Sequence, residues 1–330
     1  MGNTFVHDQS QVTYRNSSGG YATHSGASGQ WIGFVTGHTI DEEQNYFRTR
    51  YAGAASRSVS KFTKGVSDVV GTLEYVPQTW QFLGYALGSI VDGGSPSPYT
   101  HTYKEADTDA SNIFTGEVLP DFEIEDFQDG GVAGSNFVRT VGGAMVNTLT
   151  IDIAEKDQVK VSVDYLGQSV TYSSGVSLKT AEATTPEFLA EHFTWHLPSG
   201  TVVNGVGNST IEINNNLEGH HFITGSSEIQ VPIPTNREYT ITLNIMDKRQ
   251  AKALYNQYFK GGSTFNLMAN GVALTGSHEV AMVWSGCVVA DMDAPTAGEG
   301  IAAHSVTIVP RVMSAIAIDT TQFHLVGSHA

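Results

Sequence analysis

The sequence lacks features on which several classes of protein depend. It has one cysteine, Cys287, which excludes an internal disulfide bond and a zinc site built from several cysteines. No apolar run approaches the roughly 20 residues that a membrane-spanning helix needs, so we expect no membrane partner. Residues 1–11 lack the charged and then apolar layout of a signal peptide. The expected compartment is therefore the cytoplasm, or a particle assembled there.

Basic residues are also scarce. The 330 residues include 17 Lys and Arg against 33 Asp and Glu, which gives a formal net charge of −16 at pH 7. A protein that binds nucleic acid tightly needs concentrated positive charge, so stable binding of DNA or RNA is not expected. Nucleic acid could still pass along a surface of this charge without adhering to it. Ordinary charge for solubility explains the composition at least as well.

Motifs for catalysis and for cofactor binding are missing. The sequence has no G-x-S-x-G, no P-loop and no G-x-G-x-x-G. His192 and His196, beside Glu191, have the spacing of two zinc ligands on a helix. The residues around them alternate as in a strand, however, and no third ligand follows at a suitable spacing. We interpret them, like the pair His220 and His221, as surface or partly buried histidines. No catalytic residue, metal or cofactor is expected.

Alternation of polar and apolar residues, rich in Thr, Ser and Val, predicts a mainly β protein. Strands are expected near residues 31–35, 66–76, 114–118, 120–129, 146–153, 159–166, 193–197, 209–217, 238–246, 264–268, 279–289, 305–309 and 314–319. Cys287 lies in one of these apolar runs and is interpreted as a core residue.

Apolar residues at helical spacing predict two short helices. They are Trp80, Leu83 and Leu87 in the first segment, and Ala251, Leu254, Tyr255 and Tyr258 in the second. Gly88 is expected to end the first helix. Asp247 can cap the second, and the pair Gly261 and Gly262 can end it.

The predicted elements of the first half return in the second half in the same order, with one short helix at the same place in each. The corresponding pairs are Ile40 with Ile211, Val76 with Met246, and Asn147 with His304, and the shift along the sequence is nearly constant. A period of about half the chain is too long for a solenoid and indicates a duplicated domain. The expected organisation is an N-terminal arm (1–30), a first β unit (31–172), a linker (173–187) and a second β unit (188–330).

A polar stretch, 41–64, connects two predicted strands and has a counterpart at 218–237. It is long for a loop in a compact domain, and long connections are often functional arms that reach a neighbour. A surface loop without such a role is the alternative. The residues assigned to this candidate arm are Glu42, Tyr46, Phe47, Arg48, Arg50 and Arg57.

A second polar stretch, 120–129, combines acids with apolar residues in near alternation. Its candidate acids are Asp121, Glu123, Glu125 and Asp126. The order of these acids differs from that of an EF-hand calcium loop. We therefore predict a strand with one charged, solvated face, which would also suit a wall that must not bind DNA.

Three segments together resemble the tail tube proteins of long-tailed, siphovirus-like bacterial or archaeal viruses. They are V-V-G-T-L-E-Y-V-P-Q-T-W-Q-F-L-G-Y-A-L-G at 69–88, N-T-L-T-I-D-I followed by V-K-V-S-V-D-Y-L-G within 147–167, and I-E-I-N-N-N-L at 211–217. The first resembles the strand-into-helix element of that family, the second its paired closing strands, and the third a strand that ends in Asn-Asn-x-Leu. Their order and spacing cover most of the chain.

The resemblance implies a duplicated tail-tube-type β-sandwich or barrel unit with one short helix in each copy. It also implies stacked rings of subunits around a channel that DNA leaves through, with an acidic lumen. The candidate arm at 41–64 would then contact the next ring. Implied partners are copies of the same chain and the tape measure, terminator and baseplate or tip proteins of the virion tail, assembled in the host cytoplasm. With two units per chain, a trimeric ring is preferred to a hexameric one.

Two other classes of function remain as alternatives. A carbohydrate-binding or receptor-binding module of a virion would expose aromatic residues on loops, whereas the four tryptophans lie in strand or helix patterns. They are Trp31, Trp80, Trp195 and Trp284. A β-sandwich hydrolase would need a catalytic constellation that the sequence does not contain.

Overall fold

The protein is described by a computed structural model. It describes residues 10–16, 29–49, 59, 61–93, 98–106, 119–130, 136–174, 185–197, 201–221, 223, 227–273, 278–293 and 303–319. The expected strand at 114–118 and most of the expected linker at 173–187 lie outside these residues.

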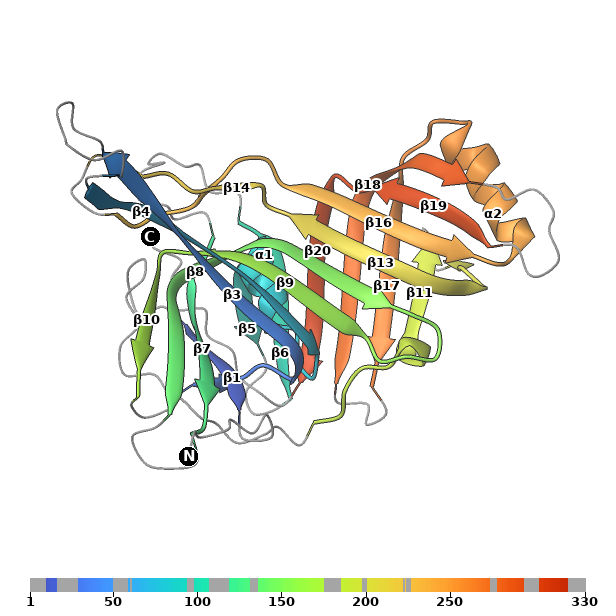
Figure 1. Cartoon of the computed structure of the whole chain (residues 1–330). Helices are drawn as coiled ribbons and strands as arrows, with labels where there is room; N and C mark the ends of the chain where they lie inside the picture. The colour runs from blue at the N-terminus through green and yellow to red at the C-terminus, as the bar shows by residue number, and fades with distance from the viewer. Residues whose placement is uncertain are drawn as a thin grey trace.

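A long antiparallel sheet runs through both halves of the chain (Figure 1). In the described residues it has eight strands, in the order β3-β4-β9-β8-β13-β16-β19-β18. Their bounds are β3 (Phe34–Thr49), β4 (Lys61–Val76), β9 (Lys160–Gly167), β8 (Phe137–Ile153), β13 (Val206–Asn214), β16 (Glu238–Ile245), β19 (His304–Val309) and β18 (Glu279–Asp293). The pairing of β8 with β13 joins the first half of the chain to the second.

Two shorter sheets flank the long sheet: in Figure 1 the first lies below it at the left, and the second lies behind it. The first has the order β2-β1-β7-β8-β10, and the second β12-β11-β17-β18-β20-β6-β5. The additional bounds are β1 (Gln11–Asn16), β2 (Gln30–Trp31), β5 (Gly88–Gly93), β6 (Tyr99–Glu105), β7 (Phe122–Gln128), β10 (Ser169–Ser173), β11 (Phe193–Leu197), β12 (Thr201–Val202), β17 (Phe265–Val272) and β20 (Val312–Asp319). A separate small hairpin pairs β14 (Leu217–Glu218) with β15 (Ile233–Pro234).

Strands β8 and β18 each belong to the long sheet and to one short sheet. The start of β8 pairs with β7 and β10, and its end pairs with β9 and β13. Gly143 and Gly286, with φ of 61° and 64°, lie where the two strands change partners. This left-handed conformation is open to glycine at little steric cost, and it lets each strand bend from one sheet into the other.

The helix α1 (Gln81–Leu87) fills the space between the long sheet and the first short sheet. All seven of its residues are buried, and Gly88 ends it in a left-handed conformation, as predicted. The ring of Phe82 contacts Tyr75 of the long sheet at 5.6 Å and Phe122 of the short sheet at 5.4 Å between centroids. Tilted and edge-on aromatic pairs of this kind combine a large buried area with favourable ring geometry.

The second helix follows β16, as predicted. It consists of α2 (Lys248–Leu254), which continues as the π-helical turn η4 (Tyr255–Phe259), while a short 3-10 helix, η2 (Ala190–His192), precedes β11. The carboxylate of Asp247 accepts a hydrogen bond from the Arg249 backbone at 2.8 Å, which confirms the predicted cap. Cys287 is buried, as predicted, and burial raises the pKa of its thiol to about 11.

Two expectations about irregular segments are wrong. Residues 11–16, expected to belong to an N-terminal arm or loop, form β1, and Tyr14 of that strand is buried in the core. The stretch 41–64, expected to be a loop, is largely an extension of the β3–β4 hairpin, in which Tyr46 pairs with Lys64. Both faces of this extension are exposed, so the alternation that marks a half-buried strand is missing.

The second half of the chain also differs from its expected alignment with the first. Strand β19 lies beside β16 as β9 lies beside β4. The strand order therefore does not support the expected match of Asn147 in β8 with His304 in β19. Both segments read as alternating Thr and apolar residues, which does not distinguish neighbouring strands of one sheet.

A buried histidine ties the β5–β6 hairpin to β20. His101 of β6 is fully buried, with Nδ1 2.7 Å from Asp92 Oδ1 and Nε2 3.2 Å from Asp319 Oδ1. Burial lowers the pKa of His101, but the hydrogen bonds with Asp319 and Asp92 outweigh it, so the net shift of the pKa is upward. The histidine therefore bridges the two carboxylates best when it is protonated.

This bridge predicts a pH dependence of stability. Because the folded pKa of His101 lies above its unfolded value of about 6.5, its contribution is complete below that value and is lost as the pH rises through the folded pKa. We expect the free energy of unfolding, measured in urea at pH 6 and pH 9, to fall in the wild type and to change less in His101→Gln. The variant His196→Gln should behave as the wild type. An equal pH dependence in wild type and His101→Gln would contradict this role.

Candidate functional site

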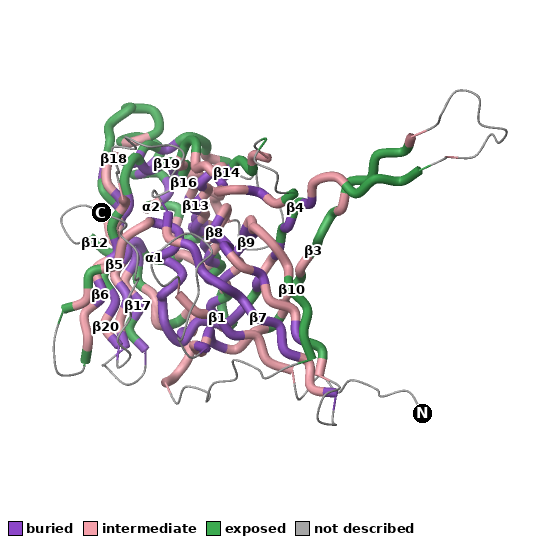
Figure 2. The backbone as a smooth tube through the Cα atoms, turned by 90° about the vertical axis from the view of Figure 1, so that its left-hand side faces the viewer, coloured by how far each residue is buried: buried purple, intermediate pink, exposed green. Residues whose placement is uncertain are grey.

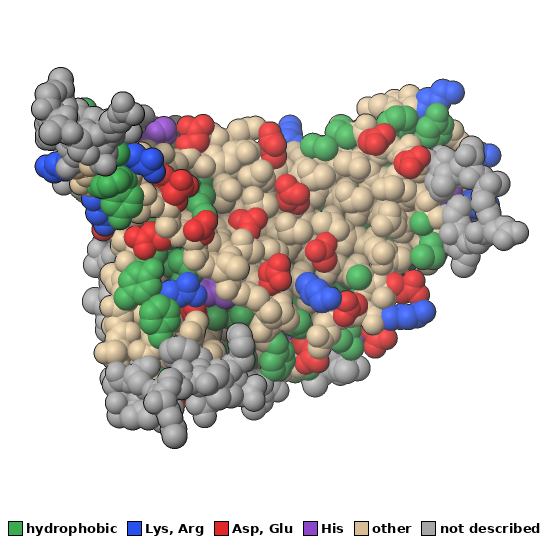
Figure 3. Space-filling model, viewed as in Figure 1, with side chains coloured by type: hydrophobic (Ala, Val, Ile, Leu, Met, Phe, Trp, Pro, Cys, Tyr) green, Lys and Arg blue, Asp and Glu red, His purple; other side chains and the backbone are tan. Residues whose placement is uncertain are grey.

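One face of the long sheet is buried and the other is exposed and polar. Along β4, Leu73 and Tyr75 point into the core, while Thr72 and Glu74 lie on the opposite face. The same alternation recurs in β9, β8, β13 and β16, whose apolar side chains are buried and whose alternate residues are polar. We call the exposed side the polar face; it faces the viewer in Figure 3.

Carboxylates are spread over the whole polar face (Figure 3). They are Asp41 and Glu43 of β3, Asp68 and Glu74 of β4, Asp164 of β9, Asp152 of β8, Glu212 of β13, Glu238 of β16, and Asp291 and Asp293 of β18. Basic residues of these strands, Arg48, Lys61 and Lys64, lie on the projecting end of the β3–β4 hairpin, and Arg139 lies at the start of β8. Lys160 is the one basic side chain in the segments that carry the acids, and its Nζ lies 2.7 Å from Asp157 Oδ2. These described segments are 39–43, 68–74, 148–152, 160–164, 210–214, 238–244 and 291–293. The face therefore presents a strongly negative surface.

Threonines alternate with the acids and fix two of them. Thr72 donates a hydrogen bond to Asp164 Oδ1 at 2.6 Å, and Thr210 donates one to Asp152 Oδ1 at 2.7 Å. The bonds link β4 to β9 and β13 to β8 across the sheet. Since ionised carboxylates accept these bonds, they hold negative charge in place. A surface of this kind repels a phosphate backbone and offers it no cationic partner.

The β3–β4 hairpin forms a second candidate surface, because its far end projects from the body of the protein (Figure 2). Tyr46, Phe47 and Phe62 are 55%, 59% and 59% exposed, and the guanidinium of Arg48 lies 6.0 Å from the ring centre of Phe62. Exposed aromatic residues beside arginine are typical of protein–protein contacts. Of the predicted arm residues, Glu42, Tyr46, Phe47 and Arg48 lie on β3, while Arg50 and Arg57 lie outside the described residues.

The four acids predicted to form a solvated face at 121–126 lie elsewhere. Asp121, Glu123, Glu125 and Asp126 are all buried, on or beside β7, which lies between β1 and β8. Arg15 of β1 forms an ion pair with Glu123, and Arg139 of β8 forms one with Asp126. These pairs compensate the cost of burying the charges. The prediction of a strand was confirmed, but that of a solvated acidic face was wrong.

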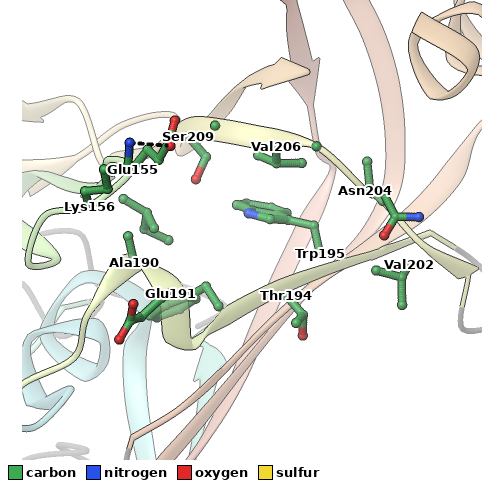
Figure 4. A pocket seen from close by; sticks show the side chains of 15 residues that line it. Glu155, Lys156, Ala190, Glu191, Thr194, Trp195, Val202, Asn204, Val206 and Ser209 are labelled. Atoms are coloured by element: carbon green, nitrogen blue, oxygen red, sulfur yellow. Dashed lines mark ion pairs between the residues drawn. The ribbon is translucent and has the colours of Figure 1, made fainter. Parts of the chain in front are cut away.

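A pocket of about 360 Å³ lies where the two halves of the chain meet (Figure 4). It is lined by the β8–β9 turn, by η2 and β11, and by the start of β13. Trp195 on its wall is only 4% exposed, because its ring stacks on Trp284 at 5.7 Å. A tryptophan this buried offers little surface for a sugar ring, so the pocket does not favour the carbohydrate-binding alternative.

The histidines near this pocket are not brought together as metal ligands. His192 Nδ1 accepts a hydrogen bond from the Leu189 backbone at 3.2 Å, and His196 Nε2 lies 3.1 Å from the Thr194 hydroxyl. Across the part of the chain that the structure describes, no group of three His, Cys, Asp or Glu side chains could hold a metal ion. In the same residues, no helix has both the length and the apolar character to cross a membrane.

The sequence is similar to one family of known function. A family model described as phage tail tube protein matches residues 13–308, which is most of the chain. No curated protein matches the sequence.

Proposed function

Because this chain belongs to the phage tail tube protein family, we propose that it builds stacked rings whose bore carries DNA out of the particle of a long-tailed virus. A member of this family is a structural protein of the virion tail, and it assembles with copies of itself and with other tail proteins into a tube. The ring, the bore and the passage of DNA are the proposal.

The continuous polar face is the observation that supports a DNA-conducting bore. It extends over every strand of the long sheet, and its charge is negative from β3 at one end to β18 at the other. DNA that moves through a channel must not adhere to the wall, and a carboxylate wall repels phosphates at every step. The opposite face packs on α1 and the short sheets, so the polar face is the one left to line a lumen.

The geometry of the long sheet favours a ring of three chains. Three copies of its eight described strands would form a barrel of 24 strands. With strands about 4.8 Å apart and tilted by about 40°, the backbone diameter would be about 48 Å. Side chains that extend about 5 Å inward leave a bore of about 38 Å, which accommodates a DNA duplex with its hydration. Six chains would double the diameter to about 96 Å.

Matching registers support the proposal that the chain is a duplicated unit. Phe122 pairs with Ala144, and Phe265 pairs with Cys287. The number of residues from Phe122 to Phe265 equals the number from Ala144 to Cys287. The bulge that follows each of these pairs lies at the same separation along the sequence, and so does the bulge between β8 and β9 relative to the one between β18 and β19. The left-handed glycines of β8 and β18 are also separated by this number of residues. A ring of three chains would then have six similar units.

Electron microscopy tests the proposed assembly directly. We expect the purified protein to form tubes at high concentration, with a central bore visible in negative stain. A protein that stays monomeric at every concentration and salt condition would contradict the proposal.

The charge of the bore gives a second prediction. Replacing Asp164 and Glu212 with lysine places positive charge on the polar face, so tubes of this variant should retain double-stranded DNA at low salt. Bound DNA should be released as salt rises, because the binding is electrostatic. Co-sedimentation of tubes with labelled DNA measures this. The control Glu155→Lys with Glu191→Lys makes the same change of charge on the β8–β9 turn and on η2, outside the strands of the polar face, and should not retain DNA. Equal retention by both variants would contradict the assignment of the bore.

A further inference from the structure

The two end strands of the long sheet have outer edges without a pairing partner among the described residues. They are residues 39–43 of β3 and residues 291–293 of β18. An unpaired edge presents free N–H and C=O groups and is a template for another strand. The identity of the strand that would pair with each edge can be derived from the junction between the halves of the chain.

Constant offsets between the halves identify the counterparts of both edges. Strand β18 corresponds to β8. Leu149 pairs with Val163, and Met292 pairs with Val306; the separation of Met292 from Leu149 along the sequence equals that of Val306 from Val163. Strand β3 corresponds to β13. Ile40 of β3 pairs with Gly71, and Ile211 of β13 pairs with Ile241. The separation of Ile211 from Ile40 along the sequence agrees with that of Ile241 from Gly71 to within a single position.

Since β8 and β13 pair with each other inside the chain, their counterparts β18 and β3 can pair between chains. We propose that β18 of one subunit pairs antiparallel with β3 of a second copy, in the register of β8 with β13. This inference rests on the proposed ring. The internal pairs are Thr150 with Glu212, Leu149 with Ile213, and Thr148 with Asn214. The offsets between β8 and β18 and between β13 and β3 convert these into the expected pairs between chains. They are Asp293 with Asp41, Met292 with Glu42, and Asp291 with Glu43.

The junction between chains differs from the internal junction in charge. Inside the chain, each acid or amide of β13 faces a threonine of β8. Between chains, Asp293 faces Asp41 and Asp291 faces Glu43 on the polar face. Like charges directly opposite each other in a sheet weaken the pairing, and dissolved cations screen the repulsion. Ring closure therefore depends on cations, whereas folding of the subunit does not depend on this contact.

Nearby groups do not cancel the repulsion. On β4, Asp68 lies opposite Glu43 and adds another carboxylate, which His221 contacts at 2.8 Å. On β19, Thr307 and Ser305 lie opposite Asp291 and Asp293 and are uncharged. The result is a seam in which carboxylates of two chains meet, and its strength rises with the concentration of salt.

Cysteine cross-linking tests the register. Glu42→Cys with Met292→Cys places two thiols directly opposite each other across the seam, at a Cβ distance of about 5 Å. Buried Cys287 can remain in place, since its pKa is raised to about 11 and its thiol reacts poorly. Oxidation of assembled tubes should link subunits head to tail, and the largest covalent species should be the ring, three chains in size.

The control for cross-linking is Glu42→Cys with Val288→Cys, in which the second thiol is four residues away along β18, about 13 Å along the strand. It should not cross-link. Tubes that form but link only in the control would overturn the register and leave the proposed function intact. Failure of both double variants and the wild type to form tubes under any condition would instead contradict the proposed function.

Salt titration tests the charge of the seam. At low salt, Asp41→Asn with Asp293→Asn should lower the protein concentration needed for assembly about ten-fold, and the difference should vanish near 1 M salt, where charges are screened. The matched control Asp152→Asn with Glu212→Gln removes two charges at the internal junction and should change the concentration less. An equal effect of both variants, or assembly of the wild type that is independent of salt, would overturn the inference.

Discussion

Removal of the projecting part of the β3–β4 hairpin should leave a folded subunit that no longer forms tubes. The proposed variant joins Gln44 to Ser67 through an Asn-Gly turn, since these two residues are cross-strand partners and Asn-Gly suits a two-residue hairpin loop. The deletion begins beyond Glu43, so the edge of β3 that the proposed seam uses remains. Contacts between rings should be lost, while single rings can still close.

The physical reason for this expectation is the distribution of burial along the hairpin. Residues 66–76 of β4 alternate between buried and exposed, whereas residues 61–64 are exposed on both sides of the strand. The tip therefore contributes little to the core, and its removal should change the melting temperature by only a few degrees. Its aromatic residues, Tyr46, Phe47 and Phe62, are exposed in the subunit, and burial against a neighbouring ring would remove them from water.

Negative-stain microscopy and analytical ultracentrifugation distinguish the outcomes. Tubes of normal length from the truncated variant would refute the role of the hairpin in stacking. A matched control is the substitution of Tyr255, an exposed aromatic residue of η4 away from the hairpin, with serine. This variant should polymerise as the wild type. Circular dichroism of the truncated variant verifies that any loss of tubes does not reflect unfolding.

The hairpin also illustrates what the sequence could not reveal. A strand is recognised by alternation because one of its faces is buried. The alternation at 159–166 correctly predicted a strand, and in β9 Val161 and Val163 are buried while Asp164 is not. Beyond Glu43, neither face of β3 packs on the core, so the signal disappears although the strand continues. The length of a projecting hairpin is set by pairing alone, which leaves no pattern in the side chains.

The acids of β7 show a second limit of prediction from the sequence, since here a pattern was present but its interpretation was wrong. Alternation in β7 predicted a solvated charged face, but Arg15 and Arg139 lie in the flanking strands and bury its carboxylates. These partners can be identified only when the order of strands is known. The acids of the polar face, by contrast, are isolated in sequence, one or two to a strand, and only the assembled sheet brings them onto one surface. The Thr-x-Asp and Ser-x-Asp spacing of β8 and β9 is the signal that could have indicated them.

Replacement of Asn215 should cost a large part of the stability of the subunit. It lies in the I-E-I-N-N-N-L segment, it is buried, and its side chain joins three elements. Its Nδ2 donates hydrogen bonds to the carbonyls of Ala86 at the end of α1, at 3.1 Å, and of Val146 in β8, at 3.0 Å. Its Oδ1 accepts a hydrogen bond from Arg237 at 2.8 Å. The side chain therefore fastens the second half of the chain to the helix and the central strand of the first.

Asn215→Asp keeps the size and shape of the side chain but replaces the donor with an acceptor, so the carbonyls of Ala86 and Val146 lose their partner and face an oxygen instead. Leaving two buried carbonyls unsatisfied should reduce the free energy of unfolding by about 3 kcal/mol. Urea unfolding of the unassembled subunit measures the change through the midpoint. The control Asn244→Asp makes the same substitution in β16, where the side chain is only half-buried, and should change stability by less than about 0.5 kcal/mol. Equal midpoints for Asn215→Asp and the wild type would show that this junction is held by the sheet alone.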